Sequence, residues 1–117
     1  MTVTDAWAVL RRGAAIEQLL GTRIDESDRV LSWIEIDVDR EGRYVVCVFQ
    51  VFDDAVEGFS DVHEFEPFDP DQPCGVCREF DAIEEAMEYA VSRGASPRRF
   101  VNAGLIAEEY RDLGSSR

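Results

Sequence analysis

Lysine is absent from this chain of 117 residues, so all 12 basic residues are arginines, and they face 25 acids. From residue 44 to residue 77 there is no Lys or Arg. Nucleic-acid binding depends on Lys and Arg side chains that neutralise phosphates, so the net charge of −13 argues against a DNA or RNA partner. Long apolar runs are missing too. None approaches the roughly 18 residues of a membrane span, and we predict no membrane partner.

Cysteine and histidine are scarce as well, with three and one residues. An odd, sparse set of cysteines is not the pattern of a disulfide-rich secreted scaffold. The first twenty residues carry arginines after their apolar residues, the reverse of a secretory signal. We therefore predict a reducing, cytoplasmic location. No catalytic motif and no phosphate-binding glycine loop is present, so we expect a non-enzymatic protein without a cofactor.

The composition is that of one globular domain spanning residues 1–117, with 45% apolar and 32% charged residues. A chain of this length buries roughly two-thirds of its unfolded surface and needs no metal or disulfide in order to fold. The order of the predicted elements indicates the α+β class. We expect a small antiparallel sheet of about three to four strands packed with an N-terminal helix and two C-terminal helices.

The first half of the chain changes from a helical to an alternating pattern. Apolar residues at i, i+3 and i+4 spacing predict a helix over residues 5–20. The charged residues 22–29 are typical of a turn. Residues 30–38 alternate between two faces, which predicts a strand, and residues 39–42 predict a hairpin turn.

The second half begins with the strand that we expect to be central. Residues 43–52 are β-branched or aromatic on both faces, which is typical of a strand covered on each side. Residues 59–66 predict a third strand, and the prolines of residues 67–77 predict a loop. A helix follows over residues 80–93. Helical pattern resumes over residues 97–113, as either one helix or two.

The helix predicted over residues 80–93 has a defined start and a defined inner face. Asp81 is the expected N-cap. The residues expected to face the core are Ile83, Met87, Ala90 and Val91. Glu84 and Glu88 lie one turn apart and are interpreted as a solvated face of this helix rather than as a catalytic pair.

Acids and aromatic residues are concentrated in the segment of residues 53–71, which we call the acidic segment. Carboxylates attract a cationic partner and speed its association, while exposed aromatic rings anchor protein interfaces. We therefore predict that this segment binds a basic protein. The partner-binding residues predicted there are Asp53, Asp54, Glu57, Phe59, Asp61, Glu64, Phe65, Glu66, Phe68, Asp69 and Asp71.

Two alternatives stay open. In the first, Cys74 and Cys77 form a CxxC pair that binds zinc or exchanges thiols, with His63 as a further ligand. A structural zinc site needs four ligands, and the flanking carboxylates disfavour thiolates, so our first interpretation is that no metal binds. In the second alternative, the excess of acids is an adaptation to high salt in a housekeeping domain.

A resemblance concerns the C-terminal part of the chain. Residues 99–110 read RFVNAGLIAEEY. With the helix before them, they resemble the C-terminal part of a family of small, uncharacterised bacterial proteins, a likeness that implies no activity or site. The whole chain is similar in size, acidity and α+β pattern to the small acidic immunity proteins of bacterial toxin systems. That likeness implies an inhibitor of a cognate toxin, such as a nuclease.

Overall fold

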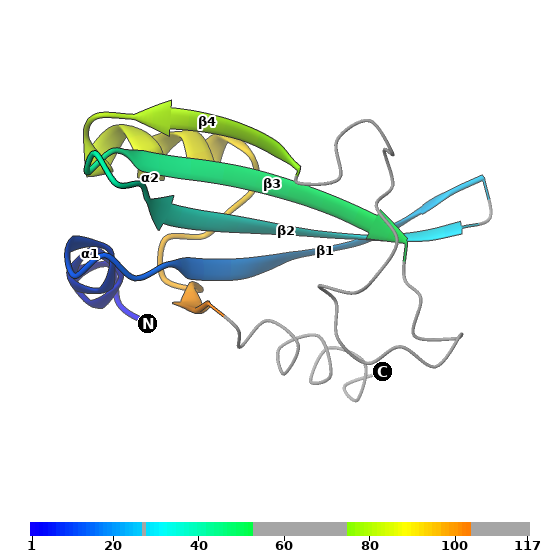
Figure 1. Cartoon of the computed structure of the whole chain (residues 1–117). Coiled ribbons are helices and arrows are strands. Elements are labelled where there is room, and N and C mark those ends of the chain that lie inside the picture. The colour runs from blue at the N-terminus through cyan, green and yellow to red at the C-terminus, as the bar shows by residue number, and fades with distance from the viewer. Residues whose placement is uncertain (27, 53–74, 104–117) are drawn as a thin grey trace.

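A computed structural model describes residues 1–26, 28–52 and 75–103, with the side chains of Asp25 and Asp28 left out. Five strands form one antiparallel sheet in the order β4-β3-β2-β1-β5, and two helices accompany it (Figure 1). The elements in chain order are α1 (Val3–Arg11), β1 (Ile16–Asp25), β2 (Asp28–Val38), β3 (Tyr44–Phe52), β4 (Val76–Phe80), α2 (Ile83–Ser92) and β5 (Val101–Asn102).

The long strands give the sheet two distinct ends. At one end, which we call the turn end, β2 passes into β3 and β4 finishes at Phe80, opposite Tyr44. At the other, which we call the tip end, the β1–β2 hairpin closes between Asp25 and Asp28 and β3 finishes at Phe52. Phe52 pairs with Val30, so the hairpin continues beyond the last residue of β3 (Figure 1).

The sheet is covered with apolar residues on both faces. Ile34 and Ile36 of β2 share one cluster with buried residues of both helices, and α1 packs on β1 and β2 while α2 packs on β3 and β4. Leu31 and Trp33 point to the opposite face, because side chains alternate along a strand, and they join a second cluster with Leu19 and Val51. Burial on both faces explains why β3 is apolar on both sides.

The central hairpin was predicted correctly. β2 and β3 cover the strands expected at residues 30–38 and 43–52, and they pair in register from Val30 opposite Phe52 to Val38 opposite Tyr44. The turn between them is held by Asp39, whose Oδ1 accepts hydrogen bonds from the backbone N–H groups of Glu41 and Arg43. Such local side-chain bonds are why Asp favours turns.

The N-terminal helix was predicted too long. α1 ends at Arg11, and Gly13 follows in the left-handed region at φ 84°, where glycine is favoured because it has no Cβ. The residues from Ile16 to Asp25 instead form β1, which pairs along nearly the whole of β2. The turn expected at residues 22–29 is thus mostly strand. Cross-strand pairing overrode a helical spacing that its apolar residues also satisfy.

Of the predicted C-terminal helices, the first was predicted correctly, whereas the helix start predicted at residue 97 was wrong. α2 lies within the predicted range, but Ala82 rather than Asp81 is its N-cap and Phe80 belongs to β4. Instead of a new helix after Ser96-Pro97, the chain makes a turn and then β5, which pairs with Ile16 and Glu17. This brings Phe100 into the core, where it is fully buried.

The α+β class is therefore confirmed, while the layout differs from the expectation in both halves of the chain. β4 occupies the end of the stretch expected to be a loop. The third strand predicted at residues 59–66, the rest of that loop and the tail beyond residue 103 lie outside the described residues. Within the described part of the chain, no helix has the length and apolar character needed to cross a membrane.

Candidate functional site

The position of the acidic segment follows from the strands that flank it. β3 ends at Phe52, β4 begins at Val76, and the two strands are antiparallel neighbours. The connection therefore leaves β3 at the tip end and returns to the strand alongside. The eleven predicted partner-binding residues themselves lie outside the described residues, so the structure locates their two attachment points.

A disulfide bond connects the start of β4 to β3. Cys47 of β3 and Cys77 of β4 are directly opposite in the register, with their Cα atoms 4.1 Å apart, and their sulfur atoms are bonded. This corrects the interpretation of Cys77 as a loop cysteine. The bond spans a sequence separation of 30 residues, and the closed loop contains the whole acidic segment.

Gly75, the residue before β4, lies directly against the backbone of β3. It adopts a φ of 79°, and a Cβ added to it would lie 2.6 Å from the carbonyl oxygen of Val48 and 3.0 Å from a ring carbon of Phe49. The first distance is shorter than any normal contact, so only glycine fits against the β3 backbone here. Two residues later the disulfide holds the same strand.

An aromatic pair supports the neighbouring row of the sheet. Trp33 and Phe49 are cross-strand partners whose rings stack with centroids 4.9 Å apart and planes 13° from parallel. They belong to the cluster with Leu19, Leu31 and Val51. Cross-strand aromatic pairs stabilise a sheet beyond the area that they bury. The disulfide, Gly75 and this pair therefore place the attachment points of the acidic segment on a rigid part of the fold.

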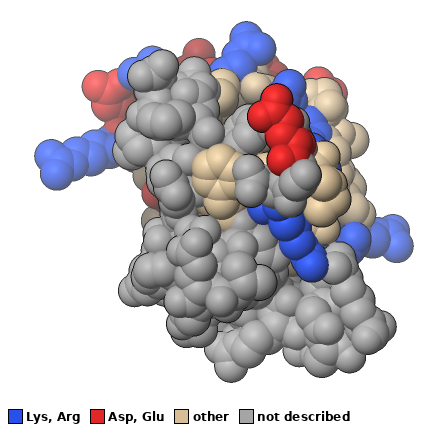
Figure 2. Space-filling model, turned by 90° about the vertical axis from the view of Figure 1, so that its right-hand side faces the viewer, with Lys and Arg blue, Asp and Glu red and all other residues tan. Residues whose placement is uncertain are grey.

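The charges described at the tip end are of both signs. Figure 2 faces this end and shows arginine and acidic side chains interspersed around the residues drawn in grey. Arg23 and Glu26 are both exposed on the hairpin. The eight acids of the acidic segment, a stretch without Lys or Arg, lie outside the described residues.

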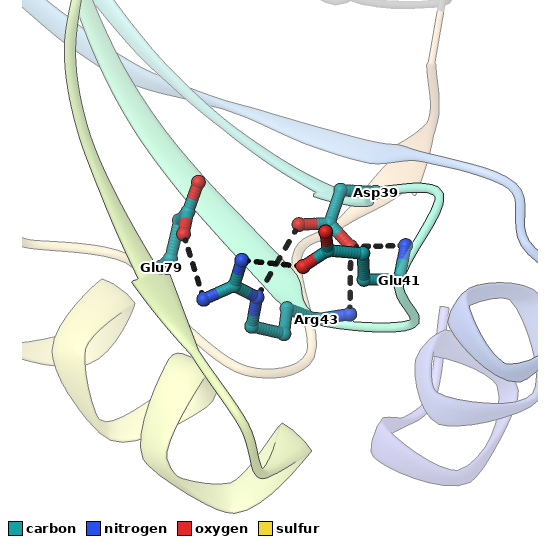
Figure 3. Close-up of polar contacts among 4 residues, drawn as sticks. All are labelled: Asp39, Glu41, Arg43 and Glu79. Carbon is teal, nitrogen blue, oxygen red and sulfur yellow. Dashed lines mark hydrogen bonds and ion pairs between the residues drawn. The ribbon is translucent and has the colours of Figure 1, made fainter.

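At the turn end, three acids lie around one arginine. Arg43 Nη2 lies 2.6 Å from Glu41 Oε2 and Arg43 Nη1 lies 3.3 Å from Glu79 Oε2, while Arg43 Nε lies 3.7 Å from Asp39 Oδ2 (Figure 3). The first two are close ion pairs, and the third is too long for a hydrogen bond. Glu79 comes from β4, so this cluster links the edge strand to the β2–β3 turn.

Comparison with protein-family models, with curated proteins and with solved structures finds no match to this chain. The candidate site thus rests on chemistry and geometry alone.

The disulfide bears on the metal alternative. In the bonded form Cys77 has no thiolate to offer zinc, which binds cysteine as the thiolate, and Cys74 and His63 lie outside the described residues. Among the residues that the structure describes, no group of three or more His, Cys, Asp or Glu side chains is placed to hold a metal ion. Since disulfides persist mainly in oxidising surroundings, the pairing also weakens the argument for a reducing compartment that was based on the cysteine count.

Sequence reasoning missed two further contacts that position the site and the core. Cys47 was assigned to an apolar strand without a partner, because β4 was not recognised. The available signal was limited to the β-branched Val76 and the aromatic Phe80 at the two ends of β4. The buried Gln18 was missed as well. Its amide donates to the carbonyl of Ser96 at 2.7 Å and accepts from the Ser96 N–H at 2.8 Å.

Proposed function

We propose that this chain is a non-enzymatic binding protein that captures a basic protein partner through the acidic segment of residues 53–71. The observation that carries the proposal is the attachment of that segment. Eight acids and no Lys or Arg occupy a connection whose two ends are held on neighbouring strands and whose loop is closed by the Cys47–Cys77 disulfide.

Closure of the loop favours binding through entropy. A segment held at both ends samples fewer conformations when free, so less conformational freedom is lost when a partner orders it. The carboxylates then act mainly on the rate of capture. Electrostatic steering raises association rates by roughly one to three decades at low salt, and it weakens as salt screens the charges. Phe59, Phe65 and Phe68 are the proposed sources of apolar contact.

The partner class follows from the sign of the charge. A carboxylate-rich surface imitates the phosphates that a nucleic-acid enzyme binds, so a nuclease toxin with a basic groove fits the proposal. The likeness in size, acidity and α+β pattern to small acidic immunity proteins points the same way. In this role the protein would mask the partner rather than transform a substrate.

The test compares two variants with equal loss of charge. In the first, Asp61, Glu64 and Glu66 of the acidic segment are changed to Asn or Gln. In the control, the exposed residues Asp5, Asp81 and Glu85, which lie on α1, before α2 and on α2, are changed in the same way. After pull-down of the partner from the native host, the first variant is expected to associate at least about tenfold more slowly at low salt, and the control to match the wild type.

Equal association rates for both variants would reject the acidic segment as the docking site.

The thiol alternative is tested separately. Since Cys77 is bonded to Cys47, zinc can bind at the CxxC pair only after reduction. Protein purified under reducing conditions without added metal should contain zinc if the alternative holds, and a content below about a tenth of an equivalent would reject it.

A further inference from the structure

The two helices leave a shallow groove between them on the outside of the molecule. α1 packs on β1 and β2, whereas α2 packs on β3 and β4, so the helices cover different halves of the same sheet face. A groove of about 400 Å³ lies between them. It is lined by Trp7 of α1, by Glu84, Met87, Glu88 and Val91 of α2, and by Pro97.

The floor of this groove is apolar and reaches solvent. Val91 belongs to the apolar stripe of α2 that was predicted to face the core, yet 43% of it is exposed, whereas Met87, one turn before it, is 7% exposed. Trp7 is half-buried, with the Arg11 guanidinium 5.7 Å from the centre of its ring. The apolar stripe of α2 is therefore wider than the surface that the sheet covers. An apolar patch rimmed by polar residues is typical of an interaction site.

The charged side chains that line the groove are acidic. Glu84 and Glu88 are exposed, stand one turn apart on α2 and line the groove; no Lys or Arg of the described part of the chain is among the lining residues, although the Arg11 guanidinium lies near the Trp7 ring. A ligand that fills the groove must therefore combine an apolar face with positive charges at its edges.

We propose that the α1–α2 groove binds a cationic amphipathic helix of a partner protein. A helix fits because the groove lies between two helices on one sheet face, where a third helix would complete the layer, and amphipathic helices commonly bind in such grooves. Its apolar side chains would contact Val91 and Trp7, and its Lys or Arg side chains would pair with Glu84 and Glu88. A second copy of this chain is disfavoured, because its outer helix faces carry the same acids and its net charge is −13. This proposal does not depend on the acidic segment.

The probe for the test is a labelled peptide of about 14 residues, or four helical turns, with Leu on one face and Lys on the other. Binding is followed by fluorescence anisotropy. Val91→Asp should weaken binding by at least about tenfold, the effect expected for a central apolar contact. Glu84→Gln with Glu88→Gln should weaken it several-fold at low salt and by less at high salt.

Matched controls separate this groove from other surfaces. Glu85→Gln removes an acid from the same helix outside the groove, and Ile24→Asp alters another exposed apolar residue, 70% exposed on the distant hairpin. Both should bind like the wild type. Because Val91 is exposed, Val91→Asp should retain the circular dichroism of the wild type, and Val91→Ser serves as a second, uncharged variant.

Three outcomes would overturn the proposal. Unchanged binding by both Val91 variants would remove the groove as the site. Loss of peptide binding on neutralising Asp61, Glu64 and Glu66, with the Val91 variants unaffected, would assign the peptide to the acidic segment instead. A concentration-dependent dimer that Val91→Asp dissociates would make a second copy the occupant.

Discussion

The two ends of the sheet handle negative charge in opposite ways. At the turn end, Arg43 lies among Asp39, Glu41 and Glu79, three acids from the turn and from β4 (Figure 3). At the tip end, the chain leaves β3 for a segment with eight acids and no Lys or Arg of its own. One end uses its acids to support a turn, while the other carries them on a tethered connection.

The difference separates residues that hold the fold from residues that we propose to act on a partner. The turn end gathers the β2–β3 turn, the start of β1, the end of β4 and β5, all within the described residues. Changes there should appear in stability. Changes in the acidic segment should appear in association rate, because charge that is not needed by the fold costs little to remove.

The largest effect is expected at Phe100, beside β5. This residue is fully buried in the cluster that joins both helices to the sheet. Phe100→Ala removes a large side chain from a packed core, and such changes typically destabilise by about 3–5 kcal/mol. Urea denaturation followed by circular dichroism measures the loss. A change below about 1 kcal/mol would mean that residues 96–103 do not pack as described.

The next largest effect concerns the Cys47–Cys77 bond, which ties β4 to β3. A closed loop of roughly 30 residues restricts the unfolded chain and contributes about 3 to 4 kcal/mol in the chain-entropy description. Cys47→Ala with Cys77→Ala should lower the urea midpoint accordingly, and a thiol reductant should do the same to the wild type.

The third cysteine provides the control for that measurement. Cys74→Ala should leave the urea midpoint unchanged and should abolish the single free thiol that labelling detects in the oxidised wild type. If Cys74→Ala destabilised as much as the double variant, the bond would connect a different pair of cysteines and the loop around the acidic segment would have to be redrawn.

How far the fold could be predicted depends on whether a pattern had one interpretation or two. Residues 30–38 alternate, residues 43–52 are β-branched or aromatic on both faces, and a strong turn signal lies between them, so this hairpin was predicted, although its register was not. Residues 16–20 satisfy both a helical spacing and the alternation of Ile16, Gln18 and Leu20 on one face. Pairing with the long strand β2 determines that these residues form a strand. Local spacing predicts β2 itself but not that residues 16–25 pair with it.

The candidate site likewise has one part that composition predicts and another that depends on strand pairing. The excess of acids in residues 53–71 can be read directly from composition. The closure of their loop could not, because it requires β4 to be recognised and aligned so that Cys77 meets Cys47. The exposure of Val91 could not be predicted either. A helical pattern shows which residues share an apolar face, but it does not show how much of that face the sheet will cover.

A smaller effect is expected for the cluster around Arg43. Its four side chains are 27% to 71% exposed, and ion pairs of this kind contribute about 0 to 1 kcal/mol each. Arg43→Gln should destabilise the protein by about 1 kcal/mol, and a double-mutant cycle with Glu79→Gln should give a coupling energy below that. A coupling that persists in molar salt would show that the pair is better shielded than its exposure indicates.

The smallest change in stability is expected in the acidic segment. Neutralising Asp61, Glu64 and Glu66 removes like charges from a stretch without Lys or Arg. The free energy of unfolding should therefore change by less than about 0.5 kcal/mol, with any shift toward greater stability at low salt. Thermal unfolding at low and at molar potassium chloride measures both effects. If instead the wild type melts much higher in molar salt and the neutralised variant loses that gain, the acids serve salt adaptation. The contrast between the two ends would then concern the solvent rather than a partner.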